Sequence, residues 1–152
     1  EASPTNVGYT QDIIWKLETN IDDCTGEALG FVMDELLAAG AKDVSFTPCF
    51  MKKNRPAYLL IVLCDESDIL QLENIIFTHT TTIGIRRMKM ERTILERHQK
   101  TIETQFGPVR VKEVTLNGKV RLSAECDDIA EIARKTGKPF GEIEREIAIA
   151  NK

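Results

Sequence analysis

Carboxylates are concentrated in one short stretch of the chain, LETNIDDCTGE, which covers residues 17–27. Glu18, Asn20 and Asp22 occupy alternate positions, so a strand would carry all three on one side, and Asp23 follows directly. Carboxylates held this close repel one another unless a cation lies between them. Oxygen ligands suit Mg²⁺ or Mn²⁺, which proteins commonly share with nucleotide phosphates. We therefore take Glu18, Asp22 and Asp23 as candidate metal ligands.

The same stretch also has a purely structural interpretation. Asp23 stands where a helix N-cap is expected, and Glu27 falls in the first helical turn, where an acidic side chain complements the helix dipole. Glu18 and Asn20 would then simply face water. The sequence leaves both interpretations open.

Cations gather at two other places in a chain whose formal net charge is −4. MKKNRP, residues 51–56, lies between two apolar runs, and TTIGIRR, residues 81–87, combines hydroxyls, a glycine and two arginines. Arginine forks and lysine point charges bind small phosphate esters, although hydrated turns and surface ion pairs use the same residue types. The candidate phosphate-binding residues are Lys52, Lys53, Asn54, Arg55, Thr81, Thr82, Arg86 and Arg87, and Lys53 and Arg55 are the candidate catalytic residues.

The composition limits what these clusters can bind. With 42% hydrophobic and 29% charged residues, the 152-residue chain has the composition of soluble globular proteins. Its 24 acidic residues outnumber its 20 basic ones, which argues against nucleic-acid binding. No apolar run approaches the roughly 20 residues of a membrane span. Four widely spaced cysteines favour neither a zinc site nor disulfides, so we expect a cytoplasmic protein.

The elements that must position these residues form a predicted unit over residues 12–97. Apolar residues at alternate positions from Ile13 to Ile21 predict a strand with one buried face, and helical spacing beyond it predicts a helix that ends at Gly40. A strand that Pro48 places at a sheet edge, an apolar strand, a second helix and a further strand follow. This βαββαβ order predicts an α+β fold with a ferredoxin-like arrangement.

Residues 98–152 predict a smaller subdomain, a β-hairpin or meander followed by two helices. Asn117-Gly118 is a strong hairpin signal, Gly137 ends the first helix and Pro139 opens the second. The two subdomains could share one core. Residues 1–11 are expected to be a tail or linker, and the chain is expected to be the C-terminal part of a longer protein.

The ferredoxin-like order constrains how the charged clusters can meet. The first strand ends where the fourth begins, so Asp22 and Arg86 are expected to be neighbours. The turn that carries Lys52 and Arg55 is expected at the opposite edge of the sheet. These cations would join Asp22 around one ligand across a subunit interface, or by leaning over the open sheet face. We therefore predict a homo-oligomer whose site takes residues from more than one chain.

Several motifs taken together resemble one protein family. LETNIDDCTGE, MKKNRP, TTIGIRR and FGPVRVK, followed by AECDD and KTGKP, stand in the order typical of the C-terminal domain of the LarC nickel-insertion proteins. The resemblance extends from about Asp12 to Asn151, which is nearly the whole chain.

The resemblance implies a function that composition does not. Members of this family insert Ni²⁺ into pyridinium bisthiocarboxylic acid mononucleotide, which completes the nickel-pincer cofactor of lactate racemase, and they split CTP into CMP and pyrophosphate with Mn²⁺ or Mg²⁺. This domain is implied to hold the metal–CTP complex, while the nickel chemistry involves an N-terminal domain. The alternatives are a non-catalytic ferredoxin-like module that senses a nucleotide or metal, and a structural oligomerisation domain.

Overall fold

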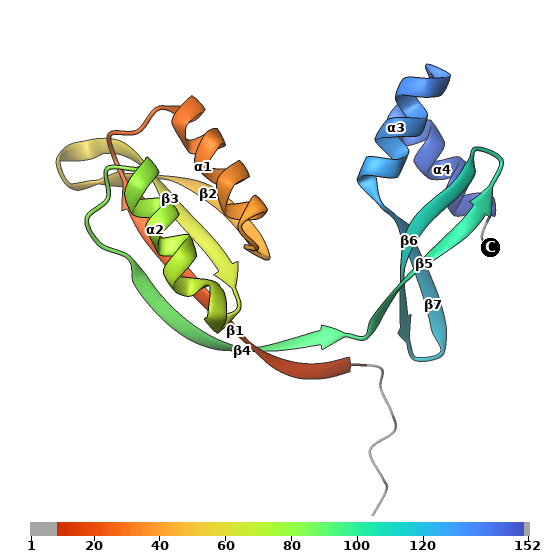
Figure 1. Ribbon diagram of the computed structural model, residues 1–152, viewed down its shortest axis with the longest axis horizontal. Coiled ribbons are helices and arrows are strands. Elements are labelled where there is room, and N and C mark those ends of the chain that lie inside the picture. Colours follow the sequence, from red (N-terminus) through yellow and green to blue (C-terminus); the bar gives the residue numbers. More distant parts are fainter. Residues whose placement is uncertain (1–8, 151–152) are drawn as a thin grey trace, which may run out of the picture. The chain divides into compact units, whose positions relative to one another are not determined.

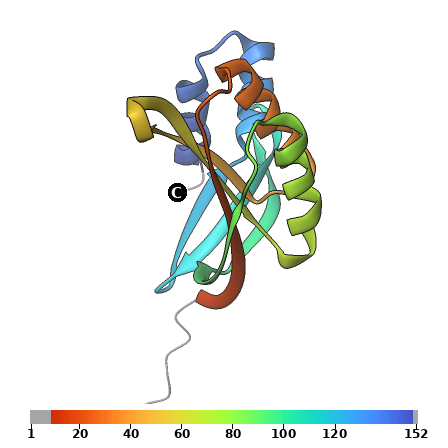
Figure 2. The same cartoon turned by 90° about the vertical axis from the view of Figure 1, so that its left-hand side faces the viewer.

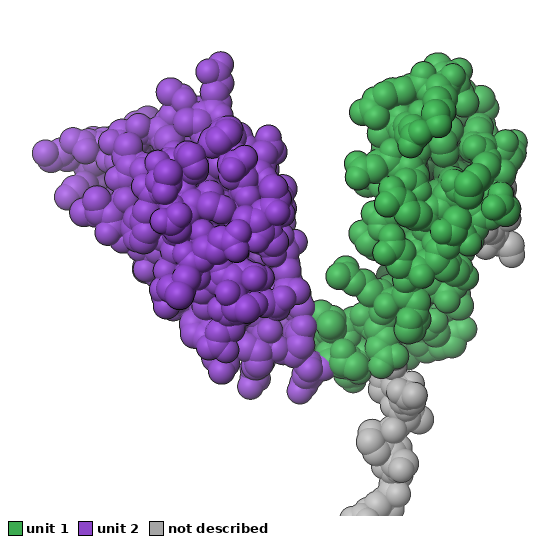
Figure 3. All heavy atoms as spheres, viewed as in Figure 1, with its two compact units in different colours: residues 1–10, 93–152 green, residues 11–92 purple. Residues whose placement is uncertain are grey.

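The computed structural model describes residues 9–150, with side chains up to residue 148, and these residues form two compact units. Of the described residues, 11–92 make the N-terminal unit, and 93–150 together with 9 and 10 make the C-terminal unit (Figure 3, purple and green). The predicted tail, residues 1–11, lies mainly outside the described residues, and its last three residues already belong to the first strand. None of the described helices is long and apolar enough to cross a membrane.

The N-terminal unit is a four-stranded sheet with two helices on one face (Figures 1 and 2). Its elements are β1 (Tyr9–Ile21), α1 (Gly26–Ala38), β2 (Asp43–Met51), β3 (Arg55–Cys64), α2 (Ile69–His79) and β4 (Arg86–Leu95), with short 3₁₀ turns at Lys52–Asn54 and Glu66–Asp68. The strand order is β2-β3-β1-β4, and β3 runs antiparallel to both β1 and β2. The predicted α+β class and βαββαβ order are confirmed, and β2, which contains Pro48, lies at a sheet edge as predicted.

The core of the N-terminal unit lies between the sheet and its helices. Leu17 and Ile21 of β1 are buried as the alternation predicts, but Ile13 is 45% exposed and its neighbour Ile14 is buried instead. The prediction for Ile13 is wrong because the alternation changes phase within β1: Ile14 and Leu17, three residues apart, are both buried. The helices and β3 complete this core with Leu29, Val32, Leu36, Leu60, Val62, Cys64, Ile69, Leu72 and Ile76.

The first helix begins later than the sequence predicts. Thr25 is its N-cap, with extended backbone angles and a hydroxyl that accepts a hydrogen bond from the Ala28 amide at 3.2 Å. Asp23, the predicted N-cap, lies two residues upstream. Its carboxylate is therefore available for a contact outside the helix, and it accepts a hydrogen bond from the Thr81 hydroxyl.

The C-terminal unit is a three-stranded antiparallel sheet followed by two helices, as predicted. Its elements are β5 (Arg97–Thr104), β6 (Gly107–Leu116), β7 (Lys119–Ala124), α3 (Cys126–Thr136) and α4 (Phe140–Ala150). Asn117 and Gly118 have the positive φ values, 50° and 73°, of a tight hairpin turn, and Gly137 ends α3 in the left-handed conformation. The unit has a hydrophobic cluster of its own, made of Val109, Val111, Ile129, Ile132, Ile143 and Ile147.

Candidate functional site

The acidic stretch meets a cation of the β2–β3 turn at one end of the sheet. In the antiparallel register, Ile21 pairs with Tyr58, so the start of β3 lies beside the end of β1. Arg55 Nη1 donates to Asp22 Oδ2 at 3.2 Å within a single chain. The expectation that this turn lies at the opposite edge is wrong for Arg55, because β3 is the immediate neighbour of β1. The charged residues therefore need no second subunit to come together.

Arg86 joins the same acidic stretch from the other side of β1. Its Nε donates to Glu18 Oε1 at 2.9 Å and its Nη2 donates to Asn20 Oδ1 at 2.7 Å. Arg86 and Lys16, whose ammonium lies 3.1 Å from Glu18 Oε2, hold the pKa of the Glu18 carboxyl below its usual range. Arg86 thus contacts the acidic stretch at Glu18 and Asn20, and the predicted closeness of Asp22 and Arg86 stays a prediction.

Arg87 does not belong to this cluster. Both its Nε and its Nη2 donate to the Glu73 carboxylate on α2, on the helix-covered face of the sheet. Consecutive residues of a strand point to opposite faces, so β4 cannot direct Arg86 and Arg87 to one ligand. Arg87 is therefore directed away from the cluster that Arg86 joins, and it pairs with Glu73 instead.

The threonine-rich loop between α2 and β4 reaches both faces of β1. Thr81 donates its hydroxyl hydrogen bond to Asp23 Oδ1, which adds a hydroxyl to the charged cluster. Thr82 lies toward the buried side instead, with its Oγ1 2.5 Å from Thr19 Oγ1 and 3.1 Å from the Gly84 carbonyl oxygen. Of the two predicted threonines, Thr81 contacts the acidic stretch, whereas the Thr82 hydroxyl contacts Thr19 and the Gly84 carbonyl oxygen.

The β2–β3 turn presents exposed cations next to Arg55. Lys53 and Asn54 have left-handed backbone angles, with φ of 63° and 54°. A non-glycine residue in this region costs free energy, and such costs cluster at functional positions. Within the described part of the chain, the side chains of Lys52, Lys53 and Asn54 make no hydrogen bond or ion pair, so they are available to a ligand.

The carboxylates do not assemble into a closed metal cage. Among residues 9–148 no three His, Cys, Asp or Glu side chains are grouped so as to hold a metal ion. The reason is visible in the contacts: Glu18, Asp22 and Asp23 face Arg86, Arg55 and Thr81 respectively. Mg²⁺ and Mn²⁺ often take only one or two protein carboxylates and share the rest of their ligands with phosphates. The donor set fits a cation bound in that way.

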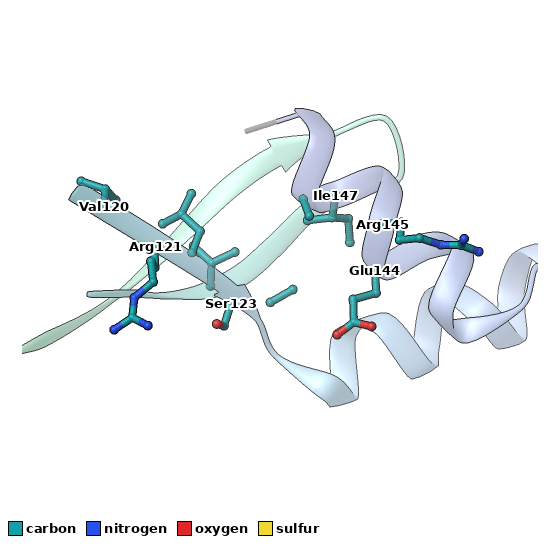
Figure 4. A pocket seen from close by; sticks show the side chains of 10 residues that line it. Val120, Arg121, Ser123, Glu144, Arg145 and Ile147 are labelled. Atoms are coloured by element: carbon teal, nitrogen blue, oxygen red, sulfur yellow. The ribbon is translucent and has the colours of Figure 1, made fainter. Parts of the chain in front are cut away.

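A hollow of about 620 Å³ in the C-terminal unit, between β7 and α4, is one alternative place for a ligand (Figure 4). Its two arginines, Arg121 and Arg145, point in different directions in Figure 4, and Arg145 donates to the Gly141 carbonyl at 2.9 Å. Most of its lining is apolar, from Val111, Val120, Leu122, Ala124, Ile147 and Ala148. Because its cations do not converge, the charged end of the N-terminal sheet is the better candidate for a phosphate ligand.

Two buried polar residues were not among the site residues predicted from the sequence. Thr19 is 1% exposed and Glu73 is 9% exposed. Both could have been found, because Thr19 interrupts the apolar row between Leu17 and Ile21, and Glu73 stands four residues after Ile69 on the buried side of a helix.

The chain is similar in sequence to proteins of a known family over nearly all of its length. The family model described as nickel insertion protein matches residues 3–144. A pyridinium-3,5-bisthiocarboxylic acid mononucleotide nickel insertion protein of Alkaliphilus metalliredigens is 50% identical over 133 residues, which are 88% of this chain and 32% of that relative. A protein of the same name from Lactiplantibacillus plantarum is 42% identical over 144 residues, 95% of this chain and 34% of the relative.

A solved structure has the same fold. The apo form of LarC2, the C-terminal domain of a cyclometallase involved in the synthesis of the NPN cofactor of lactate racemase, matches with a TM-score of 0.83 and 42% identity, covering 93% of this chain and 99% of that one. The chain spans about a third of the length of the curated relatives it matches. On sequence and fold together, the chain belongs to the nickel insertion protein family.

Proposed function

We propose that this chain is the CTP- and divalent-cation-binding part of a protein that inserts nickel into pyridinium-3,5-bisthiocarboxylic acid mononucleotide, the compound named in its relatives. CTP would be split into CMP and pyrophosphate with Mn²⁺ or Mg²⁺. Nickel is the inserted metal, and its site is proposed to lie in an N-terminal domain outside this chain. We also propose a cytoplasmic protein and a homo-oligomer, although the charged cluster no longer requires a second subunit.

One observation supports the proposal more than any other, namely that opposite charges converge within one chain. Arg55 contacts Asp22 and Arg86 contacts Glu18, while the neighbouring Asp23 accepts a hydrogen bond from Thr81. Lys52 and Lys53 stand beside Arg55 without a partner among the described residues. A metal–triphosphate complex carries both kinds of charge and would engage both sets.

Cleavage at the α–β linkage would use these residues to bind and neutralise the departing pyrophosphate. Lys53 and Arg55 are proposed to contact its oxygens, with Lys52, Asn54, Thr81 and Arg86 orienting the phosphate chain. Asp22 or Glu18 would hold the divalent cation directly or through water, and the cation supplies further charge neutralisation. Arg55 and Arg86 are therefore expected to exchange carboxylate partners for phosphate oxygens when the nucleotide binds.

A thermal-shift panel of nucleotides, each with and without Mn²⁺, tests this proposal. A ligand that binds only the folded chain raises the unfolding temperature, and the rise grows with the logarithm of the ligand concentration relative to its Kd. Selective stabilisation by CTP with metal supports the proposal. Stabilisation by a different nucleotide or by metal alone would instead indicate the non-catalytic sensing module, and no response to any ligand would favour a structural oligomerisation domain.

A further inference from the structure

The buried polar side chains Thr19 and Glu73 bind the same short segment, residues 82–87. Thr19 Oγ1 donates to the Gly84 carbonyl oxygen at 2.8 Å and lies 2.5 Å from Thr82 Oγ1. The Glu73 carboxylate accepts two hydrogen bonds from Arg87. One contact therefore holds the start of the segment and the other holds its end, both from the helix-covered side of the sheet.

Packing does not explain the hydroxyl of Thr19. This side chain is 1% exposed in a row with Leu17 and Ile21, where valine would have the same branched shape and no polar group to bury. A buried hydroxyl costs free energy unless it is hydrogen-bonded, and here its partners belong to the loop before β4. The contact therefore fixes the loop in addition to filling the core.

The opposite side of the same chain segment carries the ligand-facing groups. Thr81 contacts Asp23 immediately before the segment, and Arg86 contacts Glu18 and Asn20 within it. We propose that Thr19 and Glu73 are positioning residues, which hold Thr81 and Arg86 in place for an anionic phosphate ligand. This inference rests on the proposed function. Side chains fixed before binding lose less conformational entropy when the ligand binds, which strengthens affinity.

Thr19→Val tests the inference with little expected effect on folding. Thr82 Oγ1 lies 3.1 Å from the Gly84 carbonyl oxygen, so these two groups can still pair when the Thr19 hydroxyl is removed. We expect apparent affinity for CTP with Mn²⁺ to fall by roughly tenfold, within the range of one lost hydrogen-bond network. Hydrogen exchange of the amides in residues 80–86 should become faster while the unfolding midpoint stays close to that of the unaltered chain.

Thr19→Ser is the matched variant, because it restores the hydroxyl and should recover both the affinity and the slow exchange. A second variant, Glu73→Gln, keeps the length of the side chain but removes its charge, and should change binding and exchange in the same direction. Asp65→Asn breaks the exposed pair with Lys42 at the other end of β3 and should change neither.

Two results overturn the inference. One is unchanged exchange of residues 80–86 in Thr19→Val and Glu73→Gln; the other is faster exchange with unaltered CTP affinity. Failure of the unaltered chain to bind CTP contradicts the proposed function instead, and that outcome is seen before any variant is made.

Discussion

Asp22 has two roles in the proposed site, because its carboxylate binds Arg55 in the structure and is proposed to bind a cation beside the nucleotide. A carboxylate that holds an arginine also lowers the attraction of that arginine for phosphate. Metal binding at Asp22 would release Arg55 to the nucleotide, and phosphate binding at Arg55 would release Asp22 to the metal. The two ligands are therefore expected to strengthen each other's binding.

Asp22→Asn should remove the dependence of CTP binding on metal. The amide is a poor metal ligand and no longer holds Arg55 by charge, so affinity for metal-free CTP should rise by up to about fivefold, the upper value of a surface ion pair. Titration calorimetry with and without Mn²⁺ measures both effects. The fold should be retained because the Arg55 side chain is 54% exposed. Retention of the full Mn²⁺ effect in this variant would contradict the assignment of Asp22.

Lys53→Gly should make the folded chain more stable and at the same time weaken its binding of a triphosphate. Glycine adopts the left-handed conformation of this turn without strain, which stabilises the folded state, but it also gives the unfolded chain more conformational entropy. The net result should be a rise of about 0.5–1 kcal/mol in the free energy of unfolding. Loss of the ammonium group should at the same time weaken triphosphate binding. Chemical denaturation and a CTP titration measure the two quantities.

Asn117→Gly is the control for this substitution, since Asn117 is also left-handed, with φ of 50°, but carries no charge. It should not reduce stability and should leave CTP affinity unchanged. Equal CTP affinity in Lys53→Gly and the unaltered chain would exclude Lys53 from the site.

Among the elements, β4 is linked to β1 by two cross-strand ion pairs. Arg86 contacts Glu18, and Arg92 contacts Asp12 through two hydrogen bonds of 2.9 and 2.6 Å. Hydrogen bonds from these arginines lower the pKa of each carboxyl below its ordinary value, 4.5 for glutamate and 3.8 for aspartate. Since the lowered values belong to the folded state, the stabilisation is complete above the ordinary pKa values and is lost as the pH falls through the lowered ones.

The double variant Glu18→Gln, Asp12→Asn should therefore be less stable than the unaltered chain near neutral pH, and this difference should shrink in strongly acidic buffer. Urea unfolding at a series of pH values measures it. A difference that stays constant across the acidic range would show that ionisation of these carboxyls does not stabilise the β1–β4 pair. Glu113→Gln removes the ion pair with Lys100 in the C-terminal unit, and tests whether loss of a single ion pair elsewhere gives the same dependence of stability on pH.

At the scale of the whole molecule, each unit has its own hydrophobic cluster. Leu60→Ala and Ile143→Ala remove fully buried side chains from the N-terminal and C-terminal clusters respectively, and each should cost about 2–5 kcal/mol. Burial raises the pKa of the Cys64 thiol to about 11 and keeps it in the unreactive protonated form. Its rate of chemical labelling therefore measures how often the N-terminal unit opens.

Thiol labelling of Cys64 should become faster in Leu60→Ala and stay slow in Ile143→Ala. The exposed Cys126 should react readily in the unaltered chain and serves as the internal reference. Equal acceleration of Cys64 labelling by both substitutions would mean that the two clusters unfold together.

Much of the fold could be predicted because its signals are local. The alternation of β1 from Leu17 to Ile21, the hairpin at Asn117-Gly118 and the helix end at Gly137 each depend on a few neighbouring residues, and the structure confirms them. The different directions of Arg86 and Arg87 follow from the same alternation and could have been read from the sequence. The N-cap at Thr25 could not be separated from Asp23, because both residue types are good caps.

The sequence by itself determined the elements, their order and the charged residues available for a ligand, since side-chain period and turn chemistry act over a few residues. The tertiary structure alone decided which of these residues meet. Arg55 reaches Asp22 because β3 pairs next to β1, and Thr19 and Glu73 bind one segment because the loop before β4 returns to the core. Such contacts join positions 14 to 65 residues apart, and their physical origin is strand pairing and burial, which no short stretch of sequence specifies.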